Sequence, residues 1–191
     1  PMLQAGSRQL HHWIVLIALW SIAVAGHPES ASSQEIDPKI YESLQFRHIG
    51  PQGNRVIAVA GVPGDPSICY AGAASGGIFK STDGGVHWSP IFDEHPVSSI
   101  GSLAIASSDP NIVWAGTGET FIRSNVSLGN GIYKSPDAGK TWKHMGLTDT
   151  GRIGRIIIHP RDPDIVFALP ISHCYGPQED RGVFRTKDGG E

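Results

Sequence analysis

The chain alternates short apolar runs with turns rich in glycine, proline and aspartate. Runs at residues 56–59, 103–106 and 156–159 are each followed by an Asp-Pro dipeptide and then by a second short run. Proline cannot continue a strand ladder and aspartate favours turn initiation, so each dipeptide predicts a turn between two strands. Because β-branched and aromatic residues dominate the runs, the pattern predicts strands rather than helices.

A third strand is predicted in each unit, where apolar residues alternate with basic or hydroxyl residues. The segments are Gly-Ile-Phe-Lys-Ser at residues 77–81, Gly-Ile-Tyr-Lys-Ser at 131–135 and Gly-Val-Phe-Arg-Thr at 182–186. A period of two is typical of a strand with one face in water. A fourth strand is expected to start at Trp88 in the first unit and at Trp142 in the second.

A recurring element, Ser-x-Asp-x-Gly-x-x-Trp, separates the third strand from the fourth. Its Asp carboxylate can accept hydrogen bonds from nearby backbone N–H groups, its glycine can adopt positive φ, and its Trp can cover the turn. Since a self-capping turn accounts for these residue types at these offsets, we interpret them as structural rather than as catalytic carboxylates or metal ligands. The residues assigned to this role are Ser81, Asp83, Gly85, Trp88, Ser135, Asp137, Gly139, Trp142, Thr186, Asp188 and Gly190.

The complete unit recurs with a period of about 50 residues, slightly longer than is usual for a four-stranded propeller blade. Repeated units of this kind predict an all-β fold, a partial β-propeller with two complete four-stranded blades and part of a third. The blades are expected at about residues 41–95, 96–146 and 147–191.

The first 25 residues predict a signal peptide. Arg8 precedes an apolar run at residues 13–25 that ends in Ala-Val-Ala, the order expected of a secretory signal and its cleavage site. The run is shorter than the roughly 20 residues that a membrane-spanning helix needs. We therefore expect a signal helix at residues 1–25, a linker at 26–40, no membrane span after cleavage, and a secreted or periplasmic protein.

Composition excludes several classes of function. A formal net charge of −3 offers no basic surface for nucleic acid. Cys69 and Cys174 are far apart in unlike settings, which is not the pattern of a disulfide scaffold. We expect Cys69 to be a small buried side chain and Cys174 to be an unpaired loop thiol. The chain has no metal-spaced Cys/His set, phosphate-binding glycine loop or nucleophile elbow, so no metal or cofactor is expected.

The repeat resembles the Asp-box, or bacterial neuraminidase (BNR), family, which includes sialidases, xyloglucan-cleaving glycosidases and sortilin-type receptors. Residues 46–51, 72–77, 116–119 and 153–156 are similar to exported bacterial proteins labelled sortilin-like or glycosyl-hydrolase-like. The resemblance implies a ring with more blades than this chain supplies. Because an open stack leaves apolar faces uncovered, the chain alone is expected to be marginally stable.

Functional residues are expected on the loops between the second and third strands. These loops are long at residues 117–130 and 170–181 but short at residues 73–76. Polar loops on a rigid scaffold are preferred places for binding, and the turn elements are expected at the opposite end. The ligand-face candidates are Arg123, Asn125, His173, Tyr175 and Arg181.

Two functions remain open at this point. We favour a non-catalytic, sortilin-like propeller that presents its loops to a protein or peptide; the alternative is a glycoside hydrolase acting on extracellular saccharides. A glycosidase needs two carboxyl groups roughly 5–10 Å apart, for which the weak candidates are Glu119, Glu179 and Asp180, unless these are solvated loop charges. A sialidase would cluster arginines around a carboxylate, and the scattered candidates are Arg55, Arg123, Arg152 and Arg155.

Overall fold

The computed structural model describes residues 37–42, 44, 48–51 and 54–191, which divide into two units at residue 46. The described part of the first unit holds a 3₁₀ helix, Pro38–Tyr41, capped by Asp37, whose carboxylate accepts a hydrogen bond from the N–H of Lys39. The predicted signal peptide lies outside the described residues. None of the described helices is long and apolar enough to cross a membrane.

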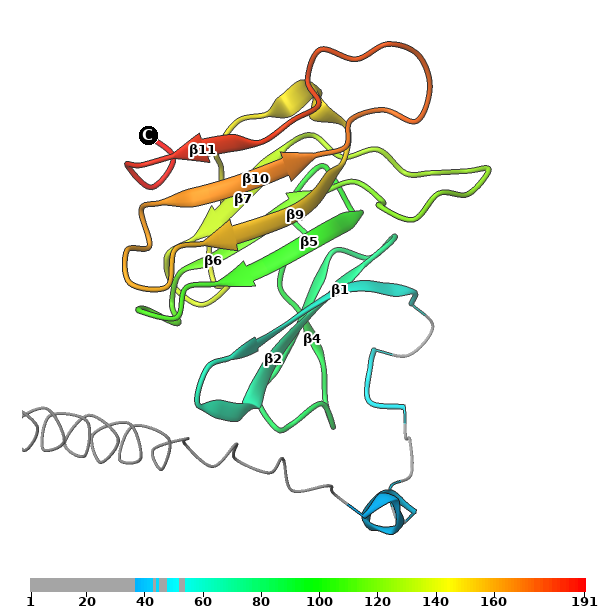
Figure 1. Ribbon diagram of the computed structural model, residues 1–191, viewed down its shortest axis with the longest axis vertical. Coiled ribbons are helices and arrows are strands. Elements are labelled where there is room, and N and C mark those ends of the chain that lie inside the picture. Colours follow the sequence, from blue (N-terminus) through cyan, green and yellow to red (C-terminus); the bar gives the residue numbers. More distant parts are fainter. Residues whose placement is uncertain (1–36, 43, 45–47, 52–53) are drawn as a thin grey trace, which may run out of the picture. The chain divides into compact units, whose positions relative to one another are not determined.

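The second unit contains three antiparallel sheets that follow one another along the chain (Figure 1). The strands of the first sheet are β1 (Val56–Val62), β2 (Asp65–Ala73), β3 (Ile78–Ser81) and β4 (Ser89–Pro90). Those of the second are β5 (Ile100–Ile105), β6 (Val113–Thr117), β7 (Ile132–Ser135) and β8 (Lys143–His144). The described part of the third has β9 (Ile153–Ile158), β10 (Val166–Pro170) and β11 (Phe184–Thr186), after a 3₁₀ turn at Thr148–Thr150. Within each sheet every strand pairs with its neighbours in sequence.

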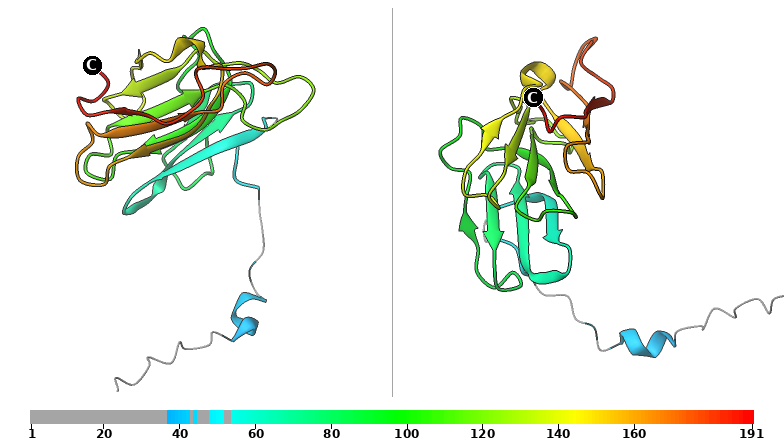
Figure 2. Two further views of the ribbon diagram at one scale, coloured as in Figure 1. Left: turned by 45° about the horizontal axis from the view of Figure 1, so that its top comes forward. Right: turned by 90° about the vertical axis from the view of Figure 1, so that its left-hand side faces the viewer.

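The sheets pack against one another through their first two strands. β1 and β2 contact β5, and β5 and β6 contact β9, as two further views show (Figure 2). Glycine permits this approach, because a Cβ on Gly72 would lie 2.6 Å from the Ile100 side chain and one on Gly116 would lie 2.5 Å from that of Ile153. The glycine next to the last residue of β2 and of β6 is therefore a packing requirement.

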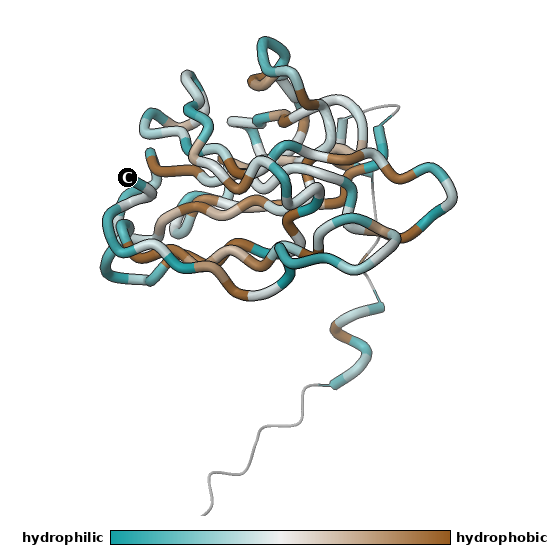
Figure 3. Tube along the Cα trace, turned by 90° about the horizontal axis from the view of Figure 1, so that it is seen from above, coloured by the Kyte–Doolittle hydropathy of each residue, from teal (hydrophilic) through white to brown (hydrophobic). Residues whose placement is uncertain are grey.

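Two apolar cores fill the spaces between successive sheets. One is built around Tyr70, Ile100 and Tyr133, and the other around Trp114 and Ile153. Apolar residues gather on the strands and hydrophilic residues on the turns (Figure 3). Alternation along the strands therefore buries one set of side chains between sheets, as expected of a strand with two unlike faces.

Some strand boundaries differ from the sequence-based expectation. β5 and β9 begin at Ile100 and Ile153, ahead of the apolar runs that predicted them. Asp65 lies inside β2 rather than in a turn, because pairing continues to Val62 after a register shift. β4 and β8 each start one residue after the tryptophan.

Both kinds of turn lie at one end of the sheets. In each sheet a backbone N–H of the Ser-x-Asp-x-Gly element, or its Thr equivalent, donates to a carbonyl of the turn between the first two strands. The three bonds are Gly84 N to Ser67 O at 2.9 Å, Ala138 N to Asn111 O at 2.8 Å and Gly189 N to Asp164 O at 2.9 Å. The loops between second and third strands are thereby left at the opposite end.

Candidate functional site

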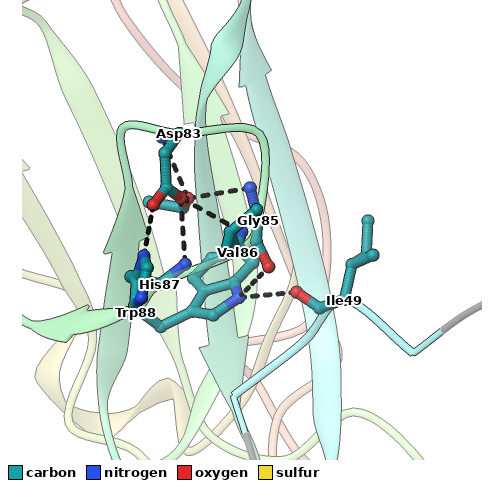
Figure 4. Close-up of polar contacts among 7 residues, drawn as sticks. Ile49, Asp83, Gly85, Val86, His87 and Trp88 are labelled. Atoms are coloured by element: carbon teal, nitrogen blue, oxygen red, sulfur yellow. Dashed lines mark hydrogen bonds and ion pairs between the residues drawn. The ribbon is translucent and has the colours of Figure 1, made fainter.

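The first Ser-x-Asp-x-Gly turn is held together by its own carboxylate (Figure 4). One oxygen of Asp83 accepts from the backbone N–H groups of Val86 at 3.0 Å and His87 at 2.9 Å, and from the Ser81 hydroxyl at 2.8 Å. The Ser81 hydroxyl oxygen in turn accepts from the N–H of Gly85 at 2.9 Å. Hydrogen bonds from His87, first from its backbone and then from its ring, hold the pKa of Asp83 well below its ordinary value.

The other two turns repeat this arrangement. Asp137 accepts from the Thr141 hydroxyl at 2.7 Å and backbone N–H at 2.8 Å, which together with Ser135 lower its pKa to about 2. The Thr186 hydroxyl bonds to the carboxylate of Asp188 and lowers its pKa in the same way. Carboxylates with this many internal donors stabilise turns and have little capacity left for a ligand.

At the opposite end, two long loops enclose a cleft of about 410 Å³. Residues 118–131 link β6 to β7, and residues 171–183 link β10 to β11 (Figure 1). The cleft is lined by Arg123, Ser124, Asn125, Val126 and Leu128 from the first loop and by His173, Cys174, Tyr175 and Gln178 from the second. The structure thus brings Arg123 and Asn125 together with His173 and Tyr175, whereas Arg181 stands beside the cleft.

The second loop is closed by its own polar contacts. The Ser172 hydroxyl donates to the side-chain oxygen Oε1 of Gln178 at 2.9 Å, and the side-chain Nε2 of Gln178 donates to the backbone carbonyl of Tyr175 at the same distance. With these two hydrogen bonds in place, Tyr175 is 82% exposed at the rim of the cleft. His173 is anchored to a carbonyl beneath it, since its Nε2 lies 3.2 Å from the Asp149 carbonyl oxygen.

Glu119 lies fully buried at the start of the first loop and connects it to Arg55, the residue before β1. Its carboxylate accepts from Arg123 Nε at 2.5 Å and Nη2 at 2.7 Å, from Arg55 Nη1 at 2.9 Å, and from the Ser127 N–H at 3.3 Å. Arg123 also donates to the Asn125 side chain at 2.7 Å. This network fixes the loop that carries half of the cleft lining.

The same contacts decide what Glu119 can do chemically. Hydrogen bonds from Arg123, together with those from Ser127 and Arg55, outweigh the burial of the carboxylate and lower its pKa to about 2. An ionised, fully paired carboxylate is poorly suited to donate a proton near neutral pH. Neither Glu179, which is exposed, nor Asp180, which is partly exposed, lines the cleft, so the described lining contains no pair of free carboxyl groups.

The arginines considered for a sialidase-type cluster have separate roles. Arg55 pairs with Glu119, and Arg155 is exposed on β9. Arg152 is only 4% exposed and donates to the carbonyls of Ser172 at 2.6 Å and His173 at 3.2 Å. It therefore supports the second loop from below.

Metal-binding side chains do not cluster in the part of the chain that the structure describes, where no group of three His, Cys, Asp or Glu residues could hold an ion. Both cysteines are free thiols. Cys174 lies in the loop as expected, but Cys69 is partly exposed rather than buried, because it borders a cleft on the first sheet.

Comparison with solved structures identifies the architecture. Neither a protein-family model nor a curated protein matches the chain. An ancestral GH74 enzyme aligns over 74% of this chain and 18% of its own, with 22% identity and a TM-score of 0.57. The GH74 xyloglucanase of Xanthomonas campestris aligns over 72% and 20%, with 19% identity and a TM-score of 0.52. YCF48 bound to D1 peptide aligns over 78% and 43%, with 15% identity and a TM-score of 0.53.

The described sheets are blades of a β-propeller. The predicted fold class, all-β with two four-stranded blades and part of a third, is confirmed. At these identities the likeness concerns the fold alone. This chain spans between 18% and 43% of the length of the three solved chains.

Gln178 and the Ser127 N–H are contributors to the site that sequence reasoning missed. Gln178 stands six residues from the hydroxyl it binds, and Ser127 eight residues from Glu119. Neither spacing matches a turn or capping pattern, so no local signal marked them.

Proposed function

We propose that this chain belongs to an exported, Asp-box, sortilin-like propeller that acts as a binding scaffold, with its ligand in the cleft between the β6–β7 and β10–β11 loops. The observation that carries the proposal is the convergence of Arg123, Asn125, His173 and Tyr175 on one cleft. Concave sites with a few convergent polar groups are the usual form of a ligand site.

The chemistry of the lining favours binding over catalysis. Tyr175 offers a large, exposed aromatic ring, and Asn125 and Gln178 supply amide groups that can both donate and accept hydrogen bonds. The guanidinium of Arg123 is engaged by Glu119 and the Asn125 side chain, so the cleft is suited to a polar ligand such as an extended peptide backbone. That a solved propeller of similar fold, YCF48, is bound to a peptide supports a peptide as the first ligand to test.

The test is to screen the full chain against a peptide array and to measure the affinity of the best binder by calorimetry. Tyr175→Ala and His173→Ala are expected to weaken binding at least about tenfold, since each removes a contact worth about 1.4 kcal/mol or more. Lys140→Ala, an exposed change at the turn end, is the matched control and is expected to bind normally. Full affinity in both cleft variants would show that the ligand binds elsewhere.

A glycoside hydrolase is the second candidate, supported by the similarity in fold to two GH74 enzymes. Xyloglucan oligosaccharides and sialyllactose are then the substrates to test, with release of reducing ends or sialic acid as the measurement. Under the binding proposal neither is hydrolysed. Hydrolysis that disappears in Glu179→Gln but persists in a surface control such as Glu94→Gln would establish the enzyme instead.

A further inference from the structure

The two side-chain amides of the cleft have their oxygen atoms bound within the protein. The Asn125 oxygen accepts from Arg123 Nη1 at 2.7 Å, and because a guanidinium has no acceptor, this partner identifies the oxygen. The Gln178 oxygen accepts from the Ser172 hydroxyl at 2.9 Å, while its Nε2 donates to the backbone carbonyl of Tyr175, which can only accept. The orientation of each amide therefore follows from the chemistry of its neighbours.

These orientations leave hydrogen-bond donors for a ligand. The Nδ2 group of Asn125 makes no hydrogen bond among the described residues, and the Nε2 group of Gln178 uses only one of its two N–H bonds. Arg123 has five N–H bonds, of which three are occupied by Glu119 and Asn125. Since Arg123, Asn125 and Gln178 all line the cleft, its walls carry several unused N–H donors.

Unused acceptors are fewer. The described lining contains no Asp or Glu, and its unused side-chain acceptors are the hydroxyl oxygens of Ser124 and Tyr175 and one ring nitrogen of His173. The Nε2 atom of His173 lies 3.2 Å from the Asp149 carbonyl oxygen and must donate to it, so Nδ1 is the acceptor of the neutral ring. Each hydroxyl can also donate. The cleft is therefore better matched to a ligand group that accepts hydrogen bonds than to one that donates them.

The charges around the cleft favour an anionic acceptor. Glu119 is a single carboxylate between the guanidinium groups of Arg55 and Arg123, so these three side chains together keep a net positive charge. Arg152 is 4% exposed, donates to the carbonyl of His173 below the second loop, and has no carboxylate partner in the part of the chain that the structure describes. A buried cation is screened less by water than an exposed one, so its attraction for an anion in the cleft is stronger.

We propose that the cleft recognises an acidic side chain, an Asp or Glu within a bound peptide, through the N–H groups of Asn125, Gln178 and Arg123. The proposal rests on the proposed peptide-binding function and specifies which peptides are bound. An ionised carboxylate has two oxygens and only accepts, so it matches a wall of donors, and hydrogen bonds to a charged acceptor are stronger than those to a neutral one. An amide or ammonium group in its place would bring N–H groups against N–H groups.

The first test is an array of octapeptides with acetylated amino ends and amidated carboxyl ends, probed with the full chain. The bound peptides are expected to contain Asp or Glu. Replacing that residue with Asn or Gln in the best-binding peptide should weaken its affinity, measured by calorimetry, at least about tenfold. Adding a free terminal carboxylate to the neutral peptide should not restore the affinity. Full recovery would make the chain end the recognised group and would overturn the proposal.

Asn125→Asp tests the donors directly, because it keeps an oxygen for Arg123 and replaces only the Nδ2 group with a second oxygen. Affinity for the acidic peptide should fall at least about tenfold through repulsion, while affinity for its neutral counterpart should change less than about threefold. A general defect in the loop would weaken both peptides alike, so the ratio of the two dissociation constants is the quantity to compare. Ser107→Asp adds the same charge at an exposed site in the turn between β5 and β6, and should leave both affinities unchanged.

The outcomes separate this inference from the function on which it rests. An array in which no peptide binds would contradict both. Binding that is lost in Tyr175→Ala but is equally strong for acidic and neutral peptides would leave the peptide-binding function in place and overturn the preference for an acidic side chain. An unchanged ratio of dissociation constants in Asn125→Asp, with circular dichroism showing the variant to be folded, would overturn it as well.

Discussion

Replacing Glu119 with glutamine removes the charge that joins the first long loop to the first blade. The wild-type carboxylate accepts four hydrogen bonds, three of them from the guanidinium groups of Arg55 and Arg123. A glutamine keeps the shape and one acceptor but turns an NH₂ group toward the arginines.

The expected loss of stability is about 2–3 kcal/mol. Hydrogen bonds to a charged group contribute about 1.5–3 kcal/mol, and breaking a buried pair costs about 3–5 kcal/mol. The expected loss lies below the cost of breaking a fully buried pair, because the side chains of Arg55 and Arg123 are 52% and 30% exposed and can regain water. For a domain of this size the change corresponds to a fall in Tm of roughly 4–12 °C.

The measurement is thermal unfolding by circular dichroism as a function of pH. The pKa of Glu119 is lowered from 4.5 to about 2, so its stabilisation is complete above pH 4.5 and is lost as pH falls toward 2. The difference in Tm between wild type and Glu119→Gln should therefore shrink across that interval. Glu179→Gln, at an exposed position in the loop between β10 and β11, is the control and should leave Tm unchanged. An equal Tm for Glu119→Gln and wild type at pH 7 would refute this account of the network.

Three further changes test the turns and the contacts between blades. Gly139→Ala is expected to lower the free energy of unfolding by at least about 2 kcal/mol, because φ is +90° and a Cβ would lie 2.6 Å from the Ile91 side chain of the first blade. Gly84→Ala is the control: its Cβ would meet no atom within 4 Å, so the loss measured by urea unfolding should be smaller. Asp137→Asn should destabilise at neutral pH, with a deficit that fades as acid titrates the wild-type carboxylate from its ordinary pKa of 3.8 down to about 2; a deficit independent of pH would contradict the assigned role. Lys80→Met should cost about 1 kcal/mol through the lost hydrogen bond to the next blade, and Lys140→Met, an exposed change, should cost nothing measurable by the same assay.

The sequence by itself determined the repeat, the strand order and the turns. These depend on local chemistry: alternation gives a strand two faces, and a Ser-x-Asp-x-Gly segment satisfies its own backbone groups. The capping of Asp83 and Asp137 involves partners within four residues, so its pattern is visible in the chain. The same locality explains why the two long loops could be singled out in advance.

Only the tertiary structure decided what the loop residues do. Glu119 meets Arg55 across 64 positions of sequence, and this contact, created when two blades pack, converts a candidate catalytic acid into a buried anchor. The carbonyl of Ile49 accepts from Trp88 as that of Ile91 accepts from Trp142, a likeness that exists only in what each residue contacts. Partners brought together by packing leave no periodic trace along the chain, since their spacing depends on how the blades stack rather than on the geometry of any one strand or turn.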